Sequence, residues 1–205
     1  MRHKNPKSER NAVLVDQPKK APVTDTKDDP EELFIRNFKN ICKASATAFA
    51  SGKSVRSSSV EGQIAVSALQ RFARRVQRIV PVPDGCSVLI SKGQSNLPTV
   101  LWVAVTKDGR LVSDGPSVAV CFGYRGDGAV AGLMDSATFR SAGLPTIARS
   151  ASGKKIIEVD GPKTKYNDHF VNPLEIGSKE KSAKPFIAHL RKSIAMLLDY
   201  YARAR

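Results

Sequence analysis

Apolar residues recur at helical spacing in two segments of the first half of the chain. Asp29 followed by Pro30 is typical of a helix start, and the apolar residues of segment 34–49 fall on one helical face. A second helix is predicted from Ser58, with Glu61 three residues later. Its predicted buried stripe consists of Ile64, Leu69, Phe72, Val76 and Ile79.

From Pro81 onward the pattern changes to short, β-branched apolar runs, which predict strands. They cover residues 87–91, 99–105, 117–122 and 129–133, with a later strand over 156–159. Asp-Gly pairs separate these runs, and glycine accepts the positive φ that tight hairpin turns require. The middle of the chain therefore predicts an antiparallel sheet built of hairpins.

The end of the chain returns to helical spacing over residues 184–204. A short helix is expected over residues 135–142, and residues 160–178 are expected to be a loop, because they are rich in glycine and proline pairs. This order predicts an α+β fold, a mostly antiparallel sheet covered by N-terminal and C-terminal helices.

The chain is long enough for one domain, which we expect over residues 29–205. It would have a helical part over 29–80, a β part over 81–160 and the C-terminal helix over 184–204. Residues 1–28 are polar and carry mixed charges, so they are expected to be a disordered tail. Local ordering of residues 12–15 is the alternative to a tail that is disordered throughout.

The formal net charge of +14 at pH 7 points to a polyanionic partner. The excess of basic over acidic side chains is distributed unevenly along the chain. Residues 31–80 contain nine basic and three acidic side chains, and residues 151–205 contain eleven basic and six acidic ones. Residues 81–150 contain six and five, so the middle is nearly neutral. This distribution favours nucleic acid over an anionic membrane surface as the partner.

Three scattered cysteines form neither a CxxC pair nor a zinc-ligand pattern, and they suit a reducing compartment. No segment approaches the run of about eighteen apolar residues that a membrane span requires. The basic N-terminus has no apolar run after it to act as a secretory signal. We therefore expect a cytoplasmic location, no membrane partner and no bound cofactor.

Arginines and polar loops supply the candidate nucleic-acid contacts. Arg71, Arg75 and Arg78 share one face of the second helix, where they can hold phosphates. Two loops, 122–128 and 161–167, combine cations with tyrosine or asparagine, which can stack on a base or bind its edge. The loop candidates are Tyr124, Arg125, Lys163, Lys165, Tyr166 and Asn167. Trp102, inside a strand-like run, is expected to be a core residue, with the wall of a base pocket as the alternative.

Two other functions stay open. A metal-dependent nuclease would use Glu158 and Asp160, which alternate on the predicted strand, with Lys163 stabilising charge and Mg²⁺ as the metal. A basic adaptor would dock its helices on an acidic protein. The histidines, the glycine-rich segments and the serines form no established catalytic motif.

The segment from Leu97 to Val105 (LPTVLWVAV), followed by Gly115 to Phe122 (GPSVAVCF), resembles the N-terminal recognition domain of the McrB family of modification-dependent restriction systems. The family has a Pro-Trp-Ile-Ala-like strand and then a Gly-x-Tyr-Val-Val-like strand. The resemblance implies a non-catalytic α+β DNA-binding module in restriction or defence that reads a modified cytosine taken out of the base stack. It also implies a separate nuclease or NTPase subunit as a partner.

Overall fold

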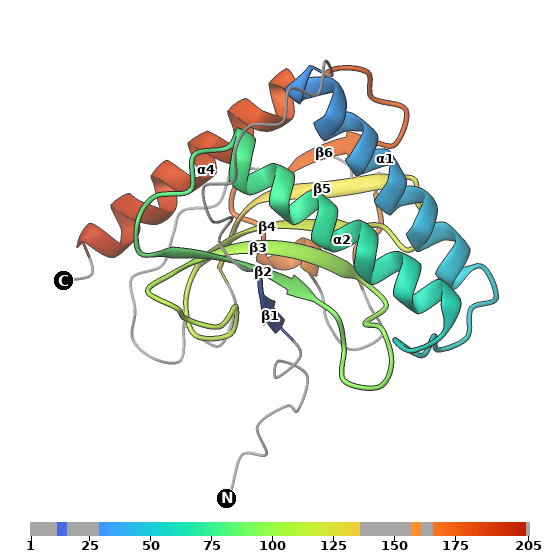
Figure 1. Cartoon of the computed structure of the whole chain (residues 1–205). Coiled ribbons are helices and arrows are strands. Elements are labelled where there is room, and N and C mark those ends of the chain that lie inside the picture. The colour runs from blue at the N-terminus through green and yellow to red at the C-terminus, as the bar shows by residue number, and fades with distance from the viewer. Residues whose placement is uncertain (1–11, 16–28, 136–156, 161–165, 204–205) are drawn as a thin grey trace, which may run out of the picture.

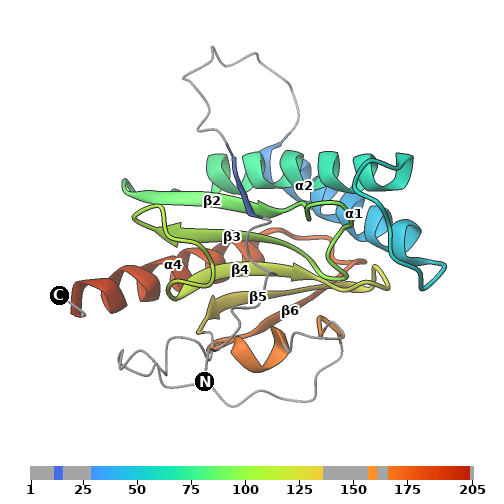
Figure 2. The ribbon, with the colours of Figure 1, turned by 90° about the horizontal axis from the view of Figure 1, so that it is seen from below.

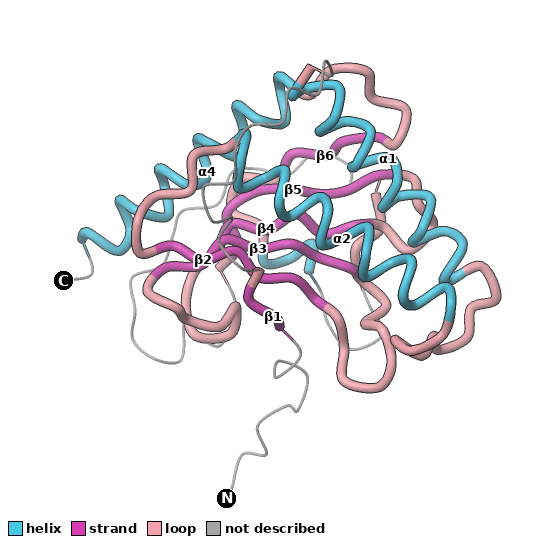
Figure 3. Tube along the Cα trace, in the orientation of Figure 1, coloured by secondary structure: helices cyan, strands magenta, loops and turns pink. Residues whose placement is uncertain are grey.

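The computed structural model describes residues 12–15, 29–135, 157–160 and 166–203. In this part of the chain, three long helices lie on one face of a six-stranded antiparallel sheet (Figure 1). The fold is therefore α+β, as the sequence predicts. Figure 3 shows the separation of the two layers by secondary structure.

The strands of the sheet follow one another in chain order, so each pairs with the next along the sequence. The tight turn predicted at Asp108-Gly109 is confirmed: both residues have positive φ values, 56° and 67°, and the N–H of Arg110 donates to the carbonyl of Lys107 at 3.2 Å. The strands are β1 (Ala12–Leu14), β2 (Cys86–Ser91), β3 (Leu101–Lys107), β4 (Ser117–Phe122), β5 (Gly128–Met134) and β6 (Leu174–Gly177).

Helices α1 (Pro30–Phe49) and α4 (Lys184–Arg203) agree closely with the sequence prediction. At the start of α1, Asp29 is the cap, and its Oδ1 accepts a hydrogen bond from the N–H of Glu31 at 3.0 Å. This bond satisfies one of the backbone donors that the first turn of a helix leaves without a partner.

Helix α2 (Val60–Ile79) begins later than predicted, because Ser59 rather than Ser58 is its cap. The Ser59 Oγ accepts a hydrogen bond from the N–H of Gly62 at 3.1 Å. The predicted buried stripe is wrong at Ile64, whose side chain is 52% exposed. Small residues replace it on the inner face, where they let the helix approach its neighbours closely: Gly62, Ala65, Ala68 and Ala73.

The main core lies between the helices and the sheet, and five phenylalanines form its centre. They are Phe34 and Phe38 of α1, Phe72 of α2, Phe122 of β4 and Phe186 of α4. Each is at most 1% exposed, and their ring centroids lie 5.1 to 6.3 Å apart. At such distances aromatic pairs contribute about 0.5–1.5 kcal/mol each beyond the burial of their area.

A second, smaller apolar cluster covers the other face of the sheet. Figure 2 shows the two faces, with α1 and α2 on one side and the orange segments 157–160 and 166–170 on the other. Burial raises the pKa of the Cys121 thiol in this cluster well above its usual range, so the thiol is an apolar packing group. The buried members are Val100, Ala104, Ala119, Cys121, Val130, Met134, Ile157, Val159 and Phe170.

Three further sequence predictions differ from the structure. The tail prediction is wrong at residues 12–15, because β1 pairs with β2 and the N–H of Val15 donates to the carbonyl of Val88 at 2.8 Å. The strand predicted at 156–159 is absent from the described residues 157–160. The predicted loop 160–178 contains a 3₁₀ helix, η2 (Tyr166–His169), and β6.

These differences arise from contacts with other parts of the chain, which the local sequence pattern does not show. β1 and β6 are short, with three and four residues, so their sequence patterns are weak and only pairing with a neighbouring strand stabilises them. Residues 157–160 are apolar at alternate positions because they pack beneath the sheet instead of extending it. Except for Asp135, the predicted helix over residues 135–142 lies outside the described residues.

The folded state is expected to lose stability in mild acid through His189 of α4. Its Nε2 lies 3.2 Å from the carbonyl oxygen of Ala131, and burial lowers the pKa of the imidazole. Protonation therefore favours the unfolded chain. The contribution of neutral His189 to the free energy of unfolding is complete above the unfolded pKa of about 6.5, and it falls as the pH drops toward the lower folded pKa. Urea unfolding at pH 7.5, 6.5 and 5.5 measures this loss.

The matched variant is His189→Gln, which keeps a hydrogen-bond donor but does not titrate. Its free energy of unfolding is expected to fall less between pH 7.5 and pH 5.5 than that of the wild type. Equal losses in the two proteins contradict the assignment to His189.

Candidate nucleic-acid interface

The outer face of α2 presents a row of arginines. Because Leu69, Phe72 and the other buried residues of α2 face the core, the opposite side of the helix faces the solvent. Arg71, Arg74 and Arg78 lie on that side, spaced by three and four residues, and all are exposed. Two of the three residues predicted to hold phosphates, Arg71 and Arg78, are therefore accessible to solvent.

The third predicted phosphate contact, Arg75, is half-buried on the flank of α2. Arg74 takes its place in the row, although the sequence prediction omitted it. The helical wheel contains the signal that finds it, because at 3.6 residues per turn Arg74 lies within about 60° of both Arg71 and Arg78, on the side of the helix opposite Phe72.

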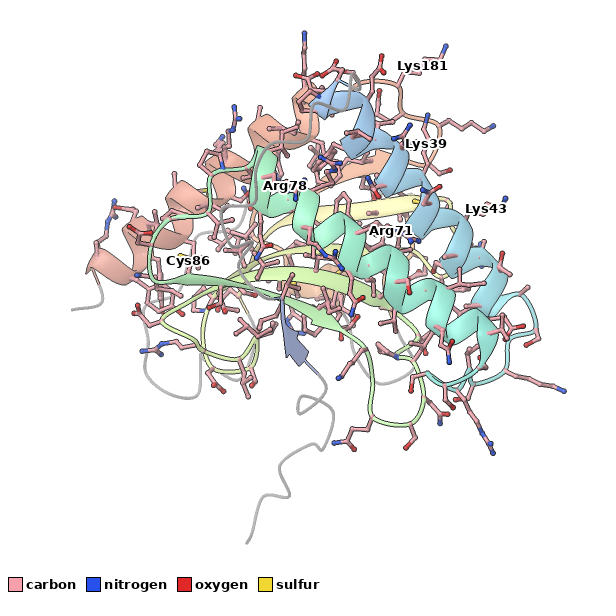
Figure 4. The ribbon with its side chains drawn as sticks, in the orientation of Figure 1. Lys39, Lys43, Arg71, Arg78, Cys86 and Lys181 are labelled. Atoms are coloured by element: carbon pink, nitrogen blue, oxygen red, sulfur yellow. The ribbon has the colours of Figure 1, made fainter. Side chains whose placement is uncertain are left out.

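The charge of this row is not neutralised within the described residues. Glu61, in the first turn, is the one acidic residue of α2, and no ion pair or hydrogen bond joins Arg71, Arg74 or Arg78 to another described residue. Figure 4 shows the Arg71 and Arg78 side chains on the outer helix layer. Helices α1, α2 and α4 together contain eleven lysines and arginines and four acidic residues.

Helix α1 adds lysines beside this row. Lys43 is exposed and Lys39 is half-buried, and Figure 4 shows both on α1, with Lys181 on the loop before α4. Lys39 interacts electrostatically with the carboxyl of Glu180, in the loop before α4. The backbone N–H groups of Ser182 and Lys181 hold the pKa of the Glu180 carboxyl below its usual value, and the charge of Lys39 adds to their effect.

The loop between β4 and β5 places Tyr124 and Arg125 next to α1. The Ser45 hydroxyl of α1 donates to the carbonyl of Gly123 at 3.1 Å, and Gly126, with a φ of 71°, lies against the backbone of α1. The Arg125 guanidinium lies 5.4 Å from the centroid of the Tyr124 ring, and its Nε donates to the Tyr124 hydroxyl at 3.1 Å. α1 therefore contacts both α2, which carries the arginine row, and the loop that carries this aromatic–cationic pair.

Trp102 lies elsewhere, on the face of the sheet opposite the helices. The Trp102 side chain is half-buried against the second apolar cluster, which Tyr166 of η2 also contacts. The backbone N–H of Trp102 donates to the Ser91 Oγ at 2.8 Å, and Cys121 is the residue opposite Trp102 on the neighbouring strand. Tyr166 and its neighbour Asn167 therefore belong to a surface separate from the arginine row. Lys163 and Lys165 lie outside the described residues.

The two candidate nuclease carboxylates serve local backbone contacts. Glu158 Oε1 accepts a hydrogen bond from the N–H of Asp160 at 2.9 Å, and Asp160 Oδ1 accepts one from the N–H of Asn167 at 2.9 Å. The prediction that they alternate on a strand is wrong, because residues 157–160 form no strand. Among the described residues there is no group of three or more His, Cys, Asp or Glu side chains placed to hold a metal ion.

The chain matches no protein-family model, no curated protein and no solved structure. Of the helices in the described part of the chain, none has the length and apolar character to cross a bilayer.

Trp102 is expected to contribute to stability rather than to the arginine surface. Trp102→Ala removes a large ring from the second apolar cluster, so we expect it to lower the free energy of unfolding by about 2 kcal/mol. At a temperature where the variant is fully folded, its affinity for unmodified duplex DNA should stay within about twofold of the wild type. Urea unfolding and fluorescence anisotropy measure the two quantities. A large loss of affinity without a loss of stability would instead place Trp102 in a binding pocket.

Proposed function

We propose that this protein is a non-catalytic nucleic-acid-binding module whose ligand is duplex DNA. The observation that carries the proposal is the row of Arg71, Arg74 and Arg78 on α2, which is exposed and has no described acidic partner. Arginine presents a planar set of donors that match phosphate oxygens in pairs. A row of three such groups on one rigid helix favours a partner with regularly spaced phosphates.

The dimensions of the row suit a nucleic-acid backbone. Arg71 and Arg78 are seven residues apart, which corresponds to about 10 Å along a helix axis. That length is about three base-pair steps of duplex DNA at 3.4 Å each. The side chains therefore reach successive phosphates without any change in the backbone of α2.

Neighbouring elements widen this surface. Lys43 of α1 is exposed, and so is Arg125 of the loop between β4 and β5, which lies against α1. Arg125 is already stacked on Tyr124, so it is partly ordered before binding, and less side-chain entropy is lost on contact with a phosphate. The aromatic ring also provides a surface for a base at a frayed or looped position.

Recognition of a modified cytosine, which the resemblance to the McrB family implies, stays a prediction. It concerns the face of the sheet that carries Trp102 and Tyr166, which the arginine row does not reach. The proposal of DNA binding by α2 does not depend on it.

The double variant Arg71→Ala/Arg78→Ala tests the proposal. We expect binding to a 24-base-pair duplex, measured by fluorescence anisotropy at 100 mM salt, to weaken by about tenfold or more. Each neutralised phosphate contributes about 0.9 to the slope of log K against log salt, so the slope should become shallower by about 1.8.

The matched control is Arg110→Ala/Arg203→Ala, which removes the same charge near the end of α4. Arg110 lies 5.4 Å from the centroid of the Tyr201 ring, and Arg203 pairs with Asp199 at 2.8 Å. This control should bind within about threefold of the wild type. Equal weakening in both double variants would mean that net charge alone acts, and unchanged binding in the α2 variant would refute the proposal.

A further inference from the structure

The outer face of α2 also exposes two apolar side chains. Val60 is 70% exposed and Ile64 is 52% exposed, and they are two of the four large apolar residues found exposed in the described part of the chain. Their spacing of four residues places them side by side on the helix surface. Ile64 is seven residues before Arg71, so the apolar pair and the arginine row lie on the same side of the helix.

Folding does not bury this pair, because the inner face of α2 is already filled. Phe72 is held among the other core rings, and Ala65, Ala68 and Leu69 are each at most 2% exposed. Turning α2 to bury Val60 and Ile64 would remove Phe72 from the core. The pair therefore stays in solvent, in line with cations, unless a partner covers it.

We propose that α2 enters the major groove of duplex DNA and that Val60 and Ile64 contact the C5-methyl groups of thymine there. This inference rests on the function proposed above and names the groove and the chemical group that are recognised. The major groove is wide enough for an α-helix, and the thymine methyl is the apolar group that the bases present in it. Val60 and Arg78 are eighteen residues apart, or about 27 Å, so the arginines can hold phosphates beyond the bases that the apolar pair contacts.

The charges around α2 favour this occupant over a lipid surface. A helix that lies in a membrane interface needs a broad apolar face, whereas the outer face of α2 offers two apolar side chains and three arginines. Arg56, just before the helix, is exposed and adds positive charge near the start of α2, where the apolar pair lies. Glu61 is compatible with the groove, because a carboxylate accepts a hydrogen bond from the amino group of cytosine.

The experiment compares two duplexes that differ by methyl groups. The full chain is titrated against a 24-base-pair alternating adenine–thymine duplex and against the same duplex with uracil in place of thymine. Uracil pairs as thymine does but lacks the C5-methyl, and every register of the protein meets the change. We expect the uracil duplex to bind about fourfold more weakly for each methyl group buried, which is the fold-change that about 0.8 kcal/mol per carbon group gives.

The variant Val60→Ala/Ile64→Ala should bind both duplexes equally and keep the salt slope of the wild type. Both side chains are exposed and alanine favours helix, so the variant is expected to fold, which circular dichroism and a thermal melt verify. The control is Leu111→Ala, another exposed apolar residue (39%), which lies on the loop between β3 and β4 and should keep the preference for thymine.

The outcomes separate this inference from the proposed function. Equal binding of both duplexes by the wild type overturns the methyl contact but leaves DNA binding by the arginines in place. A thymine preference that persists in Val60→Ala/Ile64→Ala overturns it too, because the preference then comes from the shape of the duplex. Absence of binding to any duplex overturns the proposed function itself, and an acidic protein then becomes the partner to test.

Discussion

The contact among five phenylalanine rings is the constraint on which the arrangement of this protein depends. Phe34 and Phe38, Phe72, Phe122 and Phe186 come from α1, α2, β4 and α4, so one cluster ties three helices to the middle of the sheet. Removing a buried ring costs about 3–5 kcal/mol, a large part of the stability of a single domain. The cluster therefore sets the rotation of each helix as well as its position.

That rotation decides which chemistry faces the solvent. With Phe72 inward, α2 must turn Arg71, Arg74 and Arg78 outward, together with Val60 and Ile64. The outer surface of α2 is thus a consequence of its core contacts. A binding helix held in this way needs no rearrangement to present its side chains, so little entropy is lost when a partner binds.

The sheet separates two surfaces of different character. Among the described residues, the helices on one face carry more than half of the exposed lysines and arginines, whereas small and apolar residues of β3, β4 and β5 pack beneath the other face. Asn172 links β5 to α4. Its Oδ1 accepts a hydrogen bond from the N–H of Leu133 of β5 at 2.7 Å, and its Nδ2 donates to the Ser193 hydroxyl of α4 at 3.0 Å. This buried pair of bonds fixes α4 against the sheet, and the close approach of Asn172 leaves no room for a side chain at Gly132.

The sequence by itself determined the long elements, because each contains its own signal. Asp29 and Pro30 marked the start of α1, the β-branched runs marked the central strands, and arginine spacing marked part of the α2 surface. The tertiary structure alone decided the rest: the strand made by residues 12–14, the strand β6, the exposure of Ile64 and the separation of Trp102 from the arginines. The local periodicity of apolar residues indicates that an element has one apolar and one polar face. Which face is buried, and on which side of the sheet it lies, depends on contacts between residues far apart in the chain, such as Phe72 with Phe186.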